Sequence, residues 1–338
     1  MKITSTKVGF VTLFVTFLLN MSFNFFPSVY EAVYFRSIYQ GIRVAHDFTL
    51  GYLPIPSIYL VVLFMIWLFF RNVRLNLKSW LKSLFLFLAW VVILFYWMWG
   101  FNYKQERLSN RLTLEIPSID STYITQEFLK QTELLYTIMD SMTGTQSKYY
   151  SFEDHIRENQ VAVLKEWNLP TSGRVRVRYM IPGSLLHFRT SGIYIPHAAE
   201  GHVDLGLYKK QHPFTIAHEM SHGYGITDES EANFVGYMTC IRSSRLEVVY
   251  SAELAYWRYL VRYYRSFHPG EWTDYYNSLD PRLIQDLNLI QNHIKKYKDW
   301  MPKYRDVIYD NYLKTHGVKA GIRNYDQMIL LIAAYKKK

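Results

Sequence analysis

Apolar residues are concentrated in the first hundred positions of this 338-residue chain, and this uneven distribution constrains its fold more than any other feature. Three apolar stretches cover about residues 8–26, 55–70 and 80–101. A helix that crosses a bilayer needs about 20 mostly apolar residues. We therefore expect residues 1–101 to form a membrane anchor of three transmembrane helices. The first helix is expected to stay uncleaved, because no small-residue cleavage site follows it.

The charges of the short loops predict the orientation of this anchor. Basic residues precede the first stretch and occupy the loop between the second and third: Lys2, Lys7, Arg71, Arg74, Lys78 and Lys82. Loops that stay in the cytoplasm are enriched in Lys and Arg. With three spans, residues 102–338 would then lie on the periplasmic or outer side of the cytoplasmic (inner) membrane.

The charge and the cysteine content exclude several classes of function. The formal net charge is +10, but the excess comes partly from loops beside the apolar stretches and from the terminal lysines. Because no basic and aromatic array accompanies it, we predict no nucleic-acid partner. Cys240 is the single cysteine, so an intrachain disulfide and a cysteine-based zinc cluster are both impossible. A metal would have to be held by histidines and carboxylates.

The remainder of the chain, residues 102–338, has the periodicity of one mostly helical domain. Apolar residues repeat with a period of about 3.6 in several segments, which predicts helices. The expected helices cover residues 121–141, 151–168, 214–224, 228–245, 250–267, 281–299 and 301–315. Alternating residues at 174–180 and 202–207, with a segment rich in β-forming residues at 192–195, predict a small sheet just before the helix at 214–224. The expected fold class is therefore mainly α, with a small sheet.

The helix at 214–224 contains the sequence HEMSH. Residues four apart lie on one face of a helix, so His218 and His222 can present two imidazole nitrogens to one ion. Glu219 is rotated about 100° from His218, which places its carboxylate beside the ion rather than on it. Zinc lowers the pKa of a water ligand to about 7. The motif therefore predicts a Zn²⁺ site with Glu219 as the catalytic general base.

Three carboxylates compete to be the third metal ligand. Asp228 fits the spacing HExxHxxGxxD, but it is also well placed as a helix N-cap, with Glu231 three residues later completing a capping box. Glu229 lies in the first turn of the same helix with no such local role. We assign the third ligand to Glu229, oriented by Asn233 one turn later. Residues alone leave Asp228 and Glu231 as alternatives.

Two resemblances bear on these motifs. The pattern Glu229-x-x-Ala232-Asn233 after HExxH resembles the ExxAD element of gluzincin-type peptidases, in which the Glu is the third zinc ligand. Here Asn replaces Asp and the connection is very short. The whole chain also resembles an uncharacterised bacterial family of three-span membrane proteins, domain-of-unknown-function family 3810. The motifs that carry this likeness are Trp99-Gly-Phe-Asn-Tyr103, Gly192-Ile-Tyr-Ile-Pro196, Pro213-Phe-Thr-Ile-Ala-His-Glu219, Glu229-Ser-Glu-Ala-Asn-Phe234 and Tyr312-Leu-Lys.

Other candidate residues have simpler explanations. Glu200, His197 and His202 are expected on a solvated strand edge, and the strand at 202–207 is an edge to which a peptide could add. His293 and His316 are expected on exposed helix surfaces. None of the 29 tyrosines can be singled out as a stabiliser of an oxyanion.

These features and resemblances together predict a membrane-anchored, zincin-like metallohydrolase. The expected substrate is a peptide or protein, and the expected partner of the anchor is the lipid of the cytoplasmic membrane. The alternative is a membrane sensor or scaffold that binds zinc without turnover. The residues do not specify the substrate or the oligomeric state.

Overall fold

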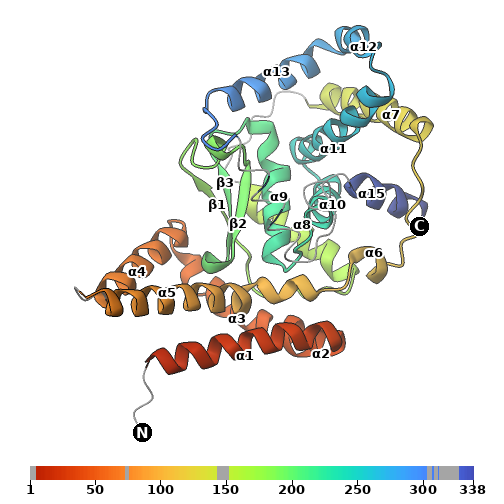
Figure 1. Cartoon of the computed structure of the whole chain (residues 1–338). Coiled ribbons are helices and arrows are strands. Elements are labelled where there is room, and N and C mark those ends of the chain that lie inside the picture. Colours follow the sequence, from red (N-terminus) through yellow and green to blue (C-terminus); the bar gives the residue numbers. More distant parts are fainter. Residues whose placement is uncertain (1–4, 73–75, 143–151, 303–306, 308–310, 312–326) are drawn as a thin grey trace.

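A computed structural model describes residues 5–72, 76–142, 152–302, 307, 311 and 327–338. The described chain is mainly helical with one three-stranded sheet, as predicted. Helix α9 (His212–Gly223) lies at the centre, against strands β2 and β3 of that sheet (Figure 1). Helices α8 (Phe152–Glu166), α10 (Glu229–Ile241) and α11 (Leu246–Phe267) also pack on α9. The predicted metal-binding helix is therefore buried on most of its surface.

The sheet has the order β1-β3-β2, with β1 (Val177–Met180) parallel and β2 (Gly192–Ile195) antiparallel to β3 (Glu200–Asp204). All five residues of β3 are buried. The prediction that this segment is a sheet edge is therefore wrong, because β3 pairs on both sides. The expectation that Glu200 and His202 are solvated is wrong for the same reason. Glu200 accepts hydrogen bonds of 2.9 Å from the backbone and hydroxyl of Ser57.

Most predicted helices are present with shifted ends. Helix α7 (Ser121–Ser141) has the predicted bounds, and its N-cap Asp120 accepts a hydrogen bond from the backbone of Tyr123. Helix α11 begins four residues earlier than predicted, and α10 ends four residues earlier. Helix α13 (Pro281–Lys295) begins at a proline behind the N-cap Asp280. The predicted helix at 301–315 lies mostly outside the described residues.

Short helices complete the domain. Helices α6 (Leu108–Arg111), α12 (Trp272–Ser278) and α15 (Gln327–Lys337) were not predicted. Helix α15 buries most of its apolar residues, mainly against α10. Its 11 residues are apolar on nearly every side, which removes the 3.6-residue pattern on which prediction depends.

In the part of the chain that the structure describes, two N-terminal helices are long and apolar enough to cross a membrane, by length and composition. They are α1 (Ser5–Phe25), whose apolar part begins at Lys7, and α5 (Leu77–Met98). The second predicted span corresponds to α4 (Ser57–Asn72), whose apolar part, Ser57–Trp67, is shorter. A signal sequence near the N-terminus can have the same length and apolar composition as α1. Within the described residues, a helix of sufficient length is therefore found for two of the three predicted spans.

The segment between α1 and α4 packs against the end of α9 and against the residues that precede β3. It comprises α2 (Pro27–Val29), a π-helix (Tyr30–Ile38), α3 (Tyr39–Asp47) and a 3₁₀ turn (Leu50–Tyr52).

Several hydrogen bonds join the N-terminal hundred residues to α9 and to the segment around the sheet. The Tyr39 hydroxyl donates to the carbonyl of Gly223 at 2.8 Å, and the Arg43 guanidinium donates to the carbonyl of Ala199 at 2.6 Å. The Trp99 indole, just after α5, donates to the carbonyl of His222 at 2.8 Å. One continuous apolar core therefore includes residues from both sides of position 101.

Candidate metal centre and active site

Two histidines and one glutamate meet at the C-terminal half of α9. The Nε2 atoms of His218 and His222 are 3.2 Å apart. The Oε2 atom of Glu229 lies 3.2 Å from the first and 3.5 Å from the second. Ligands on tetrahedral zinc, at bonds of about 2.0–2.1 Å, are about 3.3 Å from one another. The three-ligand cluster (His218, His222 and Glu229) therefore has the spacing of three corners of a zinc tetrahedron.

Close packing of α10 on α9 brings Glu229 to the histidines. Gly225, with φ of +96°, lies in the turn that reverses the chain between the two helices. Two turns after Glu229, Gly236 faces the backbone of α9, and a Cβ atom there would lie 3.1 Å from the nitrogen of His218. Ala232, on the same face, is fully buried. Small residues thus set the short distance between the helices.

The imidazole of His222 is held by its other ring nitrogen. Nδ1 lies 2.7 Å from the carbonyl of Ile226, which can only accept, so Nδ1 carries the proton and Nε2 is left for a ligand. Burial lowers the pKa of His222, but the carboxylates of Glu229 and Glu219 and the hydrogen bond with Ile226 together raise that pKa to about 9, so a metal ion at Nε2 would displace a proton. Burial raises the pKa of Glu229, yet the two imidazoles hold it well below its usual value. The cluster therefore keeps Glu229 ionised.

Glu219 lies beside the cluster with an unpaired oxygen. One carboxylate oxygen of Glu219 lies within 4.8 Å of a ring nitrogen of each histidine. The carboxylate of Glu229 is closer, at 3.2 Å from His218 and 3.5 Å from His222. The buried Oε2 atom of Glu219 has no hydrogen-bond partner among the described residues. Burial raises the pKa of Glu219 to about 7; the two histidines oppose this rise and Glu229 adds to it. Such a carboxyl can exchange a proton near neutral pH.

Two glycines of the sheet make room for Glu219. A Cβ atom on Gly192 in β2 would lie 2.6 Å from its Oε1, and one on Gly201 in β3 would lie 2.8 Å from its Cβ. The carboxylate therefore rests directly on the backbone of the sheet. The sequence placed Gly192 in an expected strand and in a motif of the resembled family, but it did not predict this contact with Glu219.

The other two acids have structural tasks. The Asp228 carboxylate caps α10, accepting from the backbone of Ser230 and Glu231 at 3.0 and 3.1 Å, and it pairs with Arg107. The predicted N-cap is thus confirmed. Glu231 does not close the predicted capping box; instead it accepts a hydrogen bond of 2.8 Å from the backbone of Leu108. Burial and the neighbouring Asp228 raise the pKa of Glu231 to about 8.

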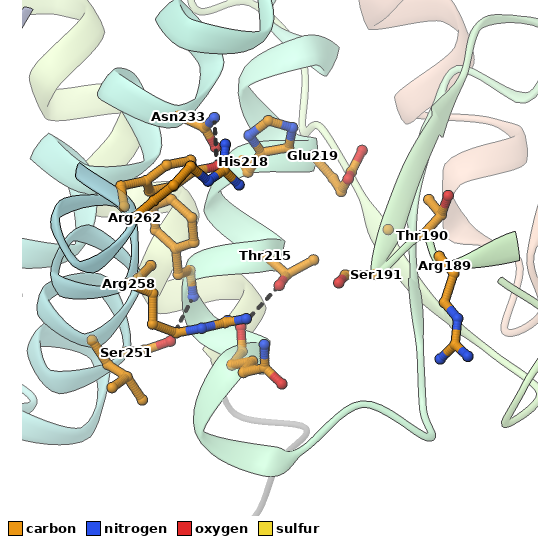
Figure 2. Close-up of a pocket in the computed structure, with 16 residues that line it drawn as sticks. Arg189, Thr190, Ser191, Thr215, His218, Glu219, Asn233, Ser251, Arg258 and Arg262 are labelled. Carbon is orange, nitrogen blue, oxygen red and sulfur yellow. Dashed lines mark hydrogen bonds between the residues drawn. The ribbon is translucent and has the colours of Figure 1, made fainter. Parts of the chain in front are cut away.

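A cavity of about 420 Å³ opens beside His218 and Glu219 (Figure 2). It lies between α9, the start of β2 and one face of α11. Its lining residues are Arg189, Thr190, Ser191, Gly192, Gln211, Phe214, Thr215, His218, Glu219, Asn233, Ser251, Leu254, Ala255, Arg258, Tyr259 and Arg262. A substrate in this cavity would contact both the cluster and Glu219.

Tyr259 is a site residue that sequence reasoning missed. Asn233, the amide that was predicted to orient Glu229, donates a hydrogen bond of 3.2 Å to the hydroxyl of Tyr259. Burial and the charge of Glu229 raise the pKa of Tyr259 to about 12, so the phenol stays protonated and able to donate. The periodicity of α11 puts Tyr259 on one face with Ser251 and Arg262, but it does not say what that face meets.

The remaining sequence candidates lie elsewhere. His197 bonds to the carbonyl of Val91 at 2.9 Å, and His293 bonds to that of Gly206 at 2.9 Å. Neither lines the cavity. His316 lies outside the described residues.

Comparison with known proteins gives a family without an activity. Residues 34–333 match the family described as "Protein of unknown function (DUF3810)". No curated protein and no solved structure matches the chain.

Proposed function

We propose that this chain, which belongs to the family of proteins of unknown function DUF3810, is a membrane-anchored zinc-dependent hydrolase of peptide bonds. The observation that carries the proposal is the three-ligand cluster at 3.2–3.5 Å with the unpaired Glu219 beside it. A third ligand from a second helix is the arrangement that the gluzincin resemblance implies. Tyr259 would donate a hydrogen bond to the substrate, and the cavity beside it would hold that substrate.

The donor set suits zinc. Two imidazole nitrogens and one carboxylate are the ligands of several catalytic zinc sites, which keep a fourth position open. When bound, zinc would supply a Lewis acid that polarises a carbonyl and lowers the pKa of water. The hydrogen bond from His222 to Ile226 fixes the ring tautomer that such a site requires.

Glu219 is the proposed general base and then general acid. Its pKa of about 7 lets it take a proton from the attacking water and return it to the departing amine. Its position on Gly192 and Gly201 limits the directions in which the carboxylate can turn. The proton therefore moves along one short path between the water and the scissile nitrogen.

Tyr259 is the proposed donor to the carbonyl oxygen of the substrate. Negative charge develops on this oxygen as water attacks, and a preorganised donor that faces it lowers the barrier. The hydroxyl accepts from Asn233, so its own proton can point into the cavity. A phenol with a pKa of about 12 stays protonated through the physiological range.

Strand β2 is the proposed docking edge for the peptide. β2 pairs with β3 on one side, and within the described sheet its other side has no strand partner. Gly192 and the preceding Thr190 and Ser191 line the cavity. A peptide that adds to this edge would run past Glu219. The sequence predicted the docking edge at residues 202–207, whereas we assign it to the neighbouring strand β2.

The proposed anchor consists of α1, α4 and α5. Large apolar side chains on all three are exposed in the structure, among them Phe10, Leu63 and Leu88. So much exposed apolar surface indicates contact with lipid. We propose that these three helices all cross the membrane; with the basic loop before α5 in the cytoplasm, the cavity would then lie outside the cytoplasm. A reporter that is active only after export, fused at Lys338, should therefore be active, and activity of a cytoplasmic reporter there would refute this topology.

Zinc content and turnover test the function together. Detergent-solubilised full-length protein should hold about one zinc per chain by elemental analysis, and His218→Ala should lose it. Zinc-loaded Glu219→Gln should keep the metal but should leave intact the membrane and secreted peptides that wild-type cells cleave. Absence of zinc after reloading would refute the metal site. Zinc without any peptide difference would favour the sensor or scaffold.

A further inference from the structure

One face of α11 brings arginines into the cavity beside the metal centre. Ser251, Ala255, Arg258 and Arg262 follow one another at helical spacing, and all line the cavity. In Figure 2 the side chains of Arg258 and Arg262 both reach from α11 toward α9, Arg262 toward His218 and Arg258 toward Thr215. Two guanidinium groups therefore face the space that a substrate would occupy.

Arginines outnumber carboxylates in the lining of this cavity. Its lining holds three arginines against one carboxylate, that of Glu219. Arg189 is held elsewhere: its guanidinium donates to the carbonyl of Ile294 at 2.9 Å and lies 3.6 Å from Asp299. Within the described part of the chain, no carboxylate pairs with Arg258, whose side chain is exposed to the cavity. Desolvation by the surrounding protein and the charge of Arg262 lower the pKa of Arg258, while Tyr259 opposes this.

We infer that Arg258, flanked by Arg262, binds a carboxylate of the substrate, so that the enzyme prefers acidic peptides. The inference rests on the proposed function, since it assigns a substrate to the same site. Two like charges one turn apart raise the energy of the empty site, and a bound anion would offset that cost. The planar guanidinium can hold a carboxylate through two parallel hydrogen bonds.

Two sources can supply this carboxylate to the same guanidinium. One is the side chain of Asp or Glu within the peptide, and the other is its free C-terminus. The cavity is lined from β2 to α11, so a peptide on the β2 edge would present one of its groups to Arg258 beyond the scissile bond. Peptides that differ in one group at a time separate the two sources.

The experiment measures binding to full-length, zinc-loaded Glu219→Gln, which cannot turn over. Fluorescent peptides containing Glu or Gln at each position, with free or amidated C-termini, are titrated by fluorescence anisotropy. We expect the preferred acidic peptide to bind at least about tenfold more tightly than its neutral isostere. A second substitution, Arg258→Gln, should abolish this ratio, and Arg258→Lys should restore part of it. Added salt should weaken only the acidic peptide.

Arg242→Gln is the matched control, because Arg242 pairs with Glu166 and does not line the cavity. It should leave the ratio unchanged. Equal affinity for acidic and neutral peptides, or a ratio that survives Arg258→Gln, would overturn the inference.

Wild-type turnover distinguishes this failure from failure of the proposed function. Hydrolysis of neutral and acidic peptides at equal rates would keep the peptidase and remove the acidic preference. Arg258-dependent binding of acidic peptides without any hydrolysis would keep the anion site and remove the peptidase.

Discussion

Asp228 and Glu229 are adjacent in sequence, yet their carboxylates point to different partners. Asp228 is occupied by the amides of α10 and by Arg107, whereas Glu229 contacts both histidines. We expect Glu229→Gln to lower zinc affinity by more than the tenfold to hundredfold typical of outer-shell changes. Asp228→Ala should keep the metal and cost about 1 kcal/mol of stability. Competition with a chelator measures the first effect and thermal unfolding the second. Loss of zinc from Asp228→Ala alone would reverse the assignment.

The buried carboxyl of Glu231 predicts a pH dependence of stability. Its pKa in the folded chain is about 8, against an ordinary value of 4.5. Between these values the folded state binds more protons than the unfolded state, so the free energy of unfolding falls as pH rises through this window. Glu231→Gln carries no titrating proton and should flatten part of this slope. The measurement is Tm of solubilised wild type and variant at pH 5 and pH 8.5. If Tm changes by the same amount between the two pH values in wild type and variant, the pH dependence does not come from Glu231.

At the scale of elements, the approach of α10 to α9 depends on Gly236. A methyl group there would lie 3.1 Å from the backbone nitrogen of His218, which cannot turn aside as a side chain can. Gly236→Ala should therefore push the helices apart and weaken zinc binding, although alanine favours a helix. Gly41→Ala is the control, because Gly41 is also helical and has open space around it. Zinc affinity that is equal in both variants would show that the interface tolerates the methyl group.

The contact between β2 and α9 makes a different prediction. A Cβ atom on Gly192 would lie 2.6 Å from Oε1 of Glu219 and 2.9 Å from the carbonyl oxygen of His202 in β3, and none of its three nearest atoms belongs to a proposed metal ligand. Gly192→Ala should retain about one zinc per chain while kcat falls by about a hundredfold, since a shift of about 1 Å at a reacting group can cost that much. Peptide hydrolysis and elemental analysis on one preparation test both parts. Zinc loss together with activity would indicate a general disruption of the sheet.

Across the whole molecule, the N-terminal hundred residues help to hold α9, the proposed metal-binding helix. The carbonyls of His222 and Gly223 at the end of α9 accept hydrogen bonds from Trp99 and Tyr39. A chain that begins at residue 102 lacks these donors and much of the shared core. We expect it to lose zinc or to aggregate, and co-expressed residues 1–101 should restore part of the metal content. A monomeric 102–338 fragment with one zinc would instead support two independent domains.

The local chemistry of the chain could be predicted without its tertiary structure. The i, i+4 spacing of His218 and His222 places both rings on one helix face whatever surrounds the helix. The N-cap role of Asp228 and the bounds of α7 also follow from contacts within a few residues of each element. Long apolar stretches similarly identify α1 and α5, because length and composition are local properties.

Only the tertiary structure decided which distant groups share the site. Glu200 and His202 belong to an alternating strand of ordinary appearance, and pairing on both sides buries them. Tyr259 and Arg258 lie about forty residues after the motif, and the packing of α11 against α9 brings them to it. The space for Glu219 depends on two glycines from different strands. Contacts between distant segments depend on how whole faces pack, and the periodicity of one segment does not specify its partner.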